Sequence, residues 1–181
     1  MEVPVQRGER LWAGEGIAVW ATDRPSRLIL EFEQEGVCEA AVRLQGLLKR
    51  HALTSSFLER LDGRSILIRR VEPLGVEAVA EAGHGSTRVT FQGSGGRSLT
   101  PEEAKAVPGM SARRLEMMED HAAHAARSLR AHLQPQGVEQ LRLTVRFGLT
   151  DDGACLAQVI NPLNCELGTT DMERLANLLG G

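Results

Sequence analysis

One segment in the C-terminal part of the chain constrains the fold more than any other. In residues 141–148 apolar and polar side chains alternate strictly, the pattern of a strand with one face in a core. The polar positions are Arg142, Thr144 and Arg146. Asp152-Gly153 supplies a tight turn before a second apolar run, so the segment predicts a β-hairpin. Because proline cannot donate to a sheet, we expect the chain to leave the sheet at Asn161-Pro162.

This hairpin resembles the C-terminal hairpin of SAICAR synthetases, which use ATP to join aspartate to a carboxylated aminoimidazole ribotide. Two stretches carry the resemblance: residues 142–148, Arg-Leu-Thr-Val-Arg-Phe-Gly, and residues 158–168, Gln-Val-Ile-Asn-Pro-Leu-Asn-Cys-Glu-Leu-Gly. The matching residues are Phe147, Gly148, Pro162, Cys165 and Leu167. In the family, acids at the positions of Gln158 and Val159 hold a metal ion. The resemblance therefore implies the fold, while those metal ligands are missing.

The N-terminal part of the chain predicts three short strands. Their ranges are Glu9–Ala13, Ile17–Ala21 and Leu28–Glu33. Residues 11–20, Leu-Trp-Ala-Gly-Glu-Gly-Ile-Ala-Val-Trp, resemble the first hairpin of the same family, whose lysines contact ATP phosphates. At those positions this chain has Glu15 and Ile17, so a carboxylate stands where phosphates would lie. A Gly-rich turn alone is weak evidence for phosphate binding, and we interpret this one as a plain hairpin turn.

The middle of the chain adds helices and strands. Apolar residues from Gly36 to Arg50 recur with the period of an amphipathic helix. Further strands are predicted over Ser55–Leu61, Ser65–Val71, Val76–Ala82 and Thr87–Gln92, with turns at Asp62-Gly63 and Pro73-Leu74-Gly75. Capping boxes at Thr100–Glu103 and Thr170–Glu173 predict two helices, the second ending at Leu179. Ser111 caps a longer helix that ends near Leu133, before Pro135 and Gly137.

These elements predict an α+β protein with a SAICAR synthetase-like fold. Residues 1–82 would form an N-terminal, mostly antiparallel β lobe, and residues 83–181 a second sheet packed by helices. A net charge of −3 gives no electrostatic reason to expect a nucleic-acid partner. The sequence shows neither a long apolar run nor a signal-peptide pattern, so we expect no membrane partner and a cytoplasmic location.

Cysteine and histidine patterns give no metal site. The three cysteines are Cys38, Cys155 and Cys165. They lack metal-site spacing and are expected to be reduced core residues. Three histidines, His121, His124 and His132, fall on one side of the long predicted helix. A His-x-x-His pair can ligate zinc, but no third ligand accompanies it, so we expect a solvated helix edge.

The polar face of residues 141–148 is the most informative candidate site. The family presents an acid, a lysine and a second acid there, whereas guanidinium groups repel Mg²⁺ and favour an anion. Ordinary solvent-facing arginines are the alternative. The candidate ligand-binding residues are Arg69, Glu77, Arg142, Thr144, Arg146, Gln158, Asn161 and Asn164. The candidate acid–base groups are Glu81, His84 and Glu166. A thiolate pair of Cys165 with His84 is a further hypothesis.

Three functions follow from these motifs. The first, which we favour, is a repurposed small-molecule protein or enzyme of secondary metabolism that needs no ATP or metal cofactor. The second is a non-catalytic scaffold or partner protein. The third is a residual ATP-dependent amide ligase with relocated ligands. A working SAICAR synthetase is not expected, a small anionic ligand is, and a homodimer is left open.

Overall fold

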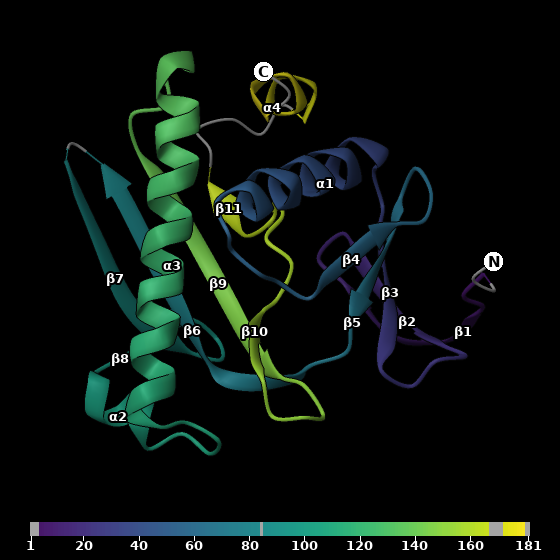
Figure 1. The fold of residues 1–181 in the computed structure, drawn as a ribbon, viewed down its shortest axis with the longest axis horizontal. Helices are drawn as coiled ribbons and strands as arrows, with labels where there is room; N and C mark the ends of the chain where they lie inside the picture. Colours follow the sequence, from purple (N-terminus) through teal and green to yellow (C-terminus); the bar gives the residue numbers. More distant parts are fainter. Residues whose placement is uncertain (1–3, 84, 167–171, 180–181) are drawn as a thin grey trace.

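The computed structural model describes residues 4–83, 85–166 and 172–179, and in this part of the chain two sheets combine with four α-helices (Figure 1). The N-terminal sheet has the order β1-β2-β3-β5-β4, with β1 Arg7–Gly14, β2 Ile17–Thr22, β3 Arg27–Phe32, β4 Phe57–Arg60 and β5 Ser65–Arg69. Neighbouring strands of this sheet are antiparallel. The predicted N-terminal antiparallel lobe is therefore confirmed.

The second sheet has the order β10-β9-β6-β7-β8, and β11 pairs with β9. Its strands are β6 Glu72–Gly83, β7 Ser86–Gly93, β8 Ser98–Leu99, β9 Leu141–Leu149, β10 Cys155–Ala157 and β11 Cys165–Glu166. The helical elements are α1 Glu35–Arg50, α2 Pro101–Lys105, α3 Ala112–Leu133, the 3₁₀ turn η1 Gln134–Gln136, and α4 Met172–Leu179. The predicted α+β class is confirmed. The predicted capping box at Thr170–Glu173 lies partly outside the described residues, which leave out 167–171.

Helix α3 covers one face of the second sheet (Figure 1). Ser111 begins it by accepting a hydrogen bond at its Oγ from the Arg114 backbone N–H, at 3.2 Å. The side chains buried along it are Leu115, Met118, Ala122, Ala125, Ala126, Ser128, Leu129 and Leu133. The helix gives way to η1, and Gly137 follows with a φ of 89° that suits glycine. The predicted bounds of this helix are confirmed.

Helix α1 buries side chains against both sheets. Its residues Ala40, Leu44, Leu47 and Leu48 belong to the core formed by α3 and the second sheet. Its residues Val37, Cys38 and Ala41 belong to a separate core with Leu30, Phe32 and Ile66 of the N-terminal sheet. Charges at its ends complement the helix dipole, with Glu35 in the first turn and Lys49 and Arg50 in the last.

Two details of the predicted organisation are wrong. We placed the boundary between lobes after Ala82, but the sheets divide between Arg69 and Glu72, because β6 pairs with β7 and β9. The predicted turn at Pro73-Leu74-Gly75 lies inside β6, where the pairing with β9 is irregular between Pro73 and Glu77. A strand tolerates proline at such an irregularity, since no regular ladder bond is lost there.

Within the described ranges, no helix has both the length and the apolar character that a membrane span needs.

Candidate functional site

A cleft of about 350 Å³ lies between the N-terminal sheet and the β9–β10 hairpin, and we call it the inter-sheet cleft. Its apolar lining comes from Trp12, Ile17, Val19, Leu28, Leu30, Ile68, Val71, Pro73 and Val159. Its polar lining comes from Glu15, Ser56, Arg69, Arg146, Gln158, Asn161 and Asn164. Segments from the beginning, the middle and the end of the chain therefore meet around one cavity, with an apolar wall and polar groups beside it.

The first hairpin turn forms part of this cleft. Glu15 and Gly16 are its two central residues, with φ of 54° and 78°. Positive φ at both positions is what a two-residue turn between right-twisted strands requires. A Cβ on Gly16 would lie 3.7 Å from Cδ1 of Leu163, so the turn lies beside the corner that follows β10. The predicted hairpin turn is confirmed, and the exposed Glu15 carboxylate lines the cleft.

Ser56 connects the two sheets where the cleft lies. Its backbone N–H donates to Ala157 O of β10 at 2.8 Å, and its backbone carbonyl accepts from Arg69 N of β5 at 2.7 Å. The Ser56 side chain is only 1% exposed, and its Oγ has no hydrogen-bond partner among the described residues. Ser56 is not among the candidate residues predicted from the sequence.

The corner at Asn161–Asn164 is stabilised by hydrogen bonds between its own residues. The Asn161 backbone N–H donates to Asn164 Oδ1 at 2.8 Å, and Leu163 N donates to Asn161 Oδ1 at 2.8 Å. Both side-chain amides also donate to Val159 O, at 3.3 and 3.2 Å. We predicted these two asparagines as ligand-binding groups. They line the cleft, but their amides already hold the corner in place, because a chain leaving a sheet must pair its backbone groups locally.

Part of the Arg146 guanidinium group is already hydrogen-bonded within the protein. Its Nε donates to Oε1 of Glu77 at 2.7 Å, and Oε2 of Glu77 accepts from Gln92 Nε2 at 2.8 Å. The three residues lie in register on adjacent strands β9, β6 and β7. Arg146 lines the inter-sheet cleft with the rest of its guanidinium group, whose Nη atoms remain as donors.

Arg142, the second arginine of the polar face of β9, does not line the inter-sheet cleft. It lines an open depression of about 610 Å³ on the polar face of the second sheet, which we call the sheet-face pocket. Its Nε is 3.9 Å from Glu81 Oε1 and 4.0 Å from Glu166 Oε1. Facing strands supply a carboxylate to each arginine, Glu81 to Arg142 and Glu77 to Arg146, so neither is an unpaired cation.

The sheet-face pocket brings together two of the three candidate acid–base groups. Arg88, Glu81, Arg142 and Glu166 lie in register across β7, β6, β9 and β11, so that charges alternate along the row. His84, the third candidate, lies outside the described residues. Thr144 is half-buried and lines neither of these two pockets, as far as the described residues show.

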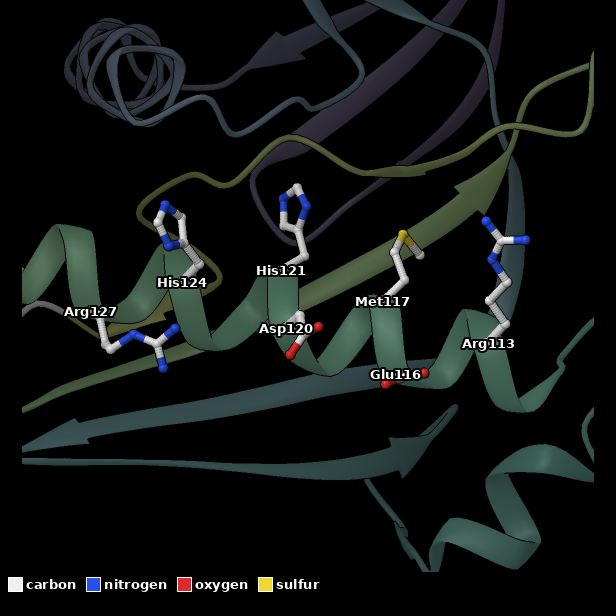
Figure 2. Close-up of a pocket in the computed structure, with 7 residues that line it drawn as sticks. All are labelled: Arg113, Glu116, Met117, Asp120, His121, His124 and Arg127. Carbon is white, nitrogen blue, oxygen red and sulfur yellow. The ribbon is translucent and has the colours of Figure 1, made fainter.

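Two of the candidate histidines, His121 and His124, line a third pocket along α3. Figure 2 shows His121 and His124 on the side of α3 that also carries Met117, while Glu116 and Asp120 point the other way. The His121 ring meets Phe147 edge-on, with centroids 5.6 Å apart, and burial lowers the pKa of His121. Among the described residues, no three His, Cys, Asp or Glu side chains are grouped to hold a metal ion.

The cysteines are placed as core residues. Cys38 and Cys165 are buried and Cys155 is half-buried, and none of the three is in a disulfide. Burial raises the pKa of all three thiols, and that of Cys165 far above its ordinary value. A high pKa keeps the thiol protonated and therefore does not suit the thiolate hypothesis for Cys165.

Solved structures with the same fold are SAICAR synthetases. The phosphoribosylaminoimidazole-succinocarboxamide synthase of Ehrlichia chaffeensis matches with a TM-score of 0.78 at 12% identity, over 95% of this chain and 98% of that one. A SAICAR synthetase in complex with ADP matches with a TM-score of 0.71 at 17% identity, over 83% and 79%. The Saccharomyces cerevisiae enzyme in complex with SAICAR matches with a TM-score of 0.65 at 8% identity, over 83% and 72%.

No protein-family profile matches the chain, and no curated protein matches it in sequence. Identities this low establish architecture and leave chemistry open. The resemblance found in the hairpin motifs is nevertheless confirmed for the arrangement of helices and strands: this chain has the fold of the SAICAR synthetases.

Proposed function

We propose that this protein binds a small anionic molecule in the inter-sheet cleft, without ATP and without a metal ion. The observation that carries the proposal is the place of four residues: Glu15, Ile17, Gln158 and Val159. All four line one cavity, and they stand where the resemblance puts phosphate-binding lysines and metal-binding acids. A cavity in this place with this lining supports the binding of a ligand other than a magnesium nucleotide.

The lining does not fit a magnesium nucleotide. Mg²⁺ is held by carboxylate and phosphate oxygens, and among the described lining residues Glu15 is the single carboxylate. That carboxylate lies on the turn that would face the phosphates and would repel them. Gln158 offers a neutral amide and Val159 offers no polar side-chain group. We therefore do not expect this cleft to bind ADP, which is bound in one of the SAICAR synthetase structures with the same fold.

The lining does fit an apolar molecule with one anionic group. Aliphatic side chains of β2, β3 and β5 form a continuous wall, and Trp12 adds an aromatic surface. Arg69 makes no salt bridge within the described residues, and Arg146 keeps its Nη donors. A guanidinium group binds a carboxylate through paired, charge-assisted hydrogen bonds. A cleft of about 350 Å³ is within the usual range for small organic ligands.

No reaction is assigned to the cleft. The acid–base candidates Glu81 and Glu166 line the sheet-face pocket, with Arg142 between them. A general acid or base must come within hydrogen-bond reach of the group it serves. We therefore propose binding as the function of the inter-sheet cleft, with any catalytic step depending on groups that the ligand itself brings near Arg69 or Arg146.

The test uses 2-naphthoate as the probe and tryptophan fluorescence as the readout, because Trp12 lines the cleft. We expect saturable binding of 2-naphthoate and none of the neutral analogue 2-naphthalenemethanol at the same concentration. Arg69→Gln should weaken binding about tenfold, the effect of losing one charged hydrogen bond. The matched control Arg70→Gln changes the next residue, which is exposed and not part of the lining.

Calorimetric titration with ATP and Mg²⁺ tests the other half of the proposal. We expect no heat of binding at micromolar concentrations. Micromolar affinity for the magnesium nucleotide would overturn the proposal in favour of a residual ligase. Equal effects of Arg69→Gln and Arg70→Gln on naphthoate binding would show that the anion is held outside the cleft.

A further inference from the structure

The hydroxyl group of Ser56 is buried beside the inter-sheet cleft and is not used by the fold. The side chain is 1% exposed, it lines the cleft, and its Oγ makes no hydrogen bond to the rest of the described chain. Burying a hydroxyl group without a hydrogen bond disfavours the folded state. A sequence that needed only packing here would be more stable with alanine.

The neighbouring serine shows the difference. Ser55 Oγ contacts Gln45 Oε1 at 2.5 Å and accepts from Phe57 N at 3.3 Å. Gln45 in turn donates to Ile160 O at 2.7 Å, so the hydroxyl of Ser55 is part of the network that holds α1 to the corner after β10. The hydroxyl group of the half-buried Ser55 therefore has a structural role, and the hydroxyl group of the buried Ser56 has none among the described residues.

The backbone of Ser56 is fixed beside the cleft. It is held on both sides, to Ala157 at 2.8 Å and to Arg69 at 2.7 Å. Ser56 lies just before β4, whose Phe57 pairs with Ile68 of β5, so Ser56 lies beside Arg69 at the end of the β4–β5 ladder. Side chains of opposite residues leave an antiparallel ladder on the same face, with Cβ atoms about 5 Å apart. Both residues contribute to the lining of the cleft, Ser56 as a buried residue and Arg69 as an exposed one.

We propose that Ser56 hydrogen-bonds the ligand at the buried end of the inter-sheet cleft. This inference rests on the proposed function and specifies the ligand class: an apolar molecule with an anionic group for Arg69 and a hydroxyl or carbonyl oxygen for Ser56. Such a ligand is an apolar hydroxy acid or oxo acid. The bound oxygen supplies the partner that the Ser56 hydroxyl lacks in the protein, so part of the specificity comes from a group whose burial weakens the fold.

The inference predicts opposite effects on stability and on binding for one substitution. Ser56→Ala removes an unpaired buried hydroxyl group and keeps the packing of the Cβ, so the melting temperature should stay the same or rise. Preference for an oxygen-bearing ligand should be lost. Ser55→Ala is the matched control, and it should lower the melting temperature because it breaks the contact with Gln45.

The experiment compares 2-naphthoate with 3-hydroxy-2-naphthoate and 6-hydroxy-2-naphthoate, which place a hydroxyl group near to or far from the carboxylate. The wild-type protein should bind one hydroxy acid about fivefold more tightly than 2-naphthoate, the effect of one added hydrogen bond. Ser56→Ala should bind that acid and 2-naphthoate equally. Ser56→Cys, which keeps the volume but is a weak donor, should also lose most of the preference.

Two results would overturn the role of Ser56: a wild-type protein that prefers neither hydroxy acid, or a preference that survives in Ser56→Ala. In both cases 2-naphthoate itself still binds, so the proposed function stands. If none of the three acids binds to the wild-type protein, the proposed function fails together with this inference.

Discussion

The Nε of Arg146 lies 2.7 Å from Oε1 of Glu77, directly across the β6–β9 pair. This pairing decides how much positive charge the inter-sheet cleft presents, because it leaves Arg146 with a partner that competes with any anionic ligand. Arg146 is half exposed, at 52% of its side chain, and Glu77 is mostly buried, at 17%. The pair therefore restrains Arg146 more than it stabilises the protein.

Glu77→Gln should release Arg146 and tighten the binding of 2-naphthoate several-fold. The free energy of unfolding should fall by less than about 1 kcal/mol, since a salt bridge with an exposed partner contributes little. Glu81→Gln is the control, because it removes the acid beside Arg142 in the sheet-face pocket. Equal gains in affinity from both variants would mean that the change in net charge acts at long range and that Arg146 has no specific part.

Asn161→Ala should destabilise the protein by about 1–3 kcal/mol, because it removes the acceptor of the part-buried Leu163 N–H and the buried donor to Val159 O. The side chain is 4% exposed, so this change is unlike an ordinary surface substitution. Chemical denaturation measures the loss. Leu163→Ser serves as the control in the same corner, since Leu163 is 49% exposed and its side chain should matter little. Unchanged stability of Asn161→Ala would show that the corner is held by its backbone bonds alone.

Gly148→Ala should cost about 1–3 kcal/mol of stability, the range for overpacking a filled site. An added Cβ would lie 2.7 Å from Val71 Cγ2 and 2.8 Å from Glu72 O, and a backbone oxygen inside a sheet cannot move far. Gly46→Ala on α1 is the control, because nothing lies within 4 Å of the added atom. That variant should gain up to about 1 kcal/mol from helix propensity. A neutral Gly148→Ala would show that β6 and β9 can separate locally.

The pH dependence of stability should contain a contribution from His121. Burial, and then the nearby His124, lower the pKa of His121 from its ordinary value of 6.5. Below that value the unfolded chain takes up a proton that the folded chain resists, so stability is lost as the pH falls from 6.5 towards the lower pKa of the folded state. The drop in melting temperature from pH 7.5 to pH 5 should be smaller for His121→Leu than for the wild type. An equal drop in the wild type and in His121→Leu would show that His121 makes no such contribution.

Local patterns in the sequence predicted most of the elements. Strict alternation over residues 141–148 predicted β9, and the apolar period after Ser111 predicted α3 together with its end. Both signals are strong because a strand or helix with one buried face must repeat its apolar residues at a fixed spacing. The fold class followed from the order of the elements and from the family motifs.

The partners of each strand and side chain could not be predicted in the same way. The alternation of Val76–Ala82 identifies a strand but does not indicate which sheet it joins, and that choice depends on contacts with β9, far along the chain. Glu77 was named as a ligand group and turned out to neutralise Arg146. No pattern around Ser56 indicates a role for it. Its burial depends on a contact with Ala157, which lies far along the chain and cannot be predicted from the neighbouring residues.

Helix α1 has a consequence for how the whole molecule unfolds. Its buried residues are divided between the core of the N-terminal sheet and the core of the second sheet, so neither core is complete without the same sixteen-residue helix. Loss of that helix exposes apolar surface on both sides at once. The two sheets should therefore melt in a single cooperative transition, with equal calorimetric and van't Hoff enthalpies, and neither should fold when expressed as a separate fragment.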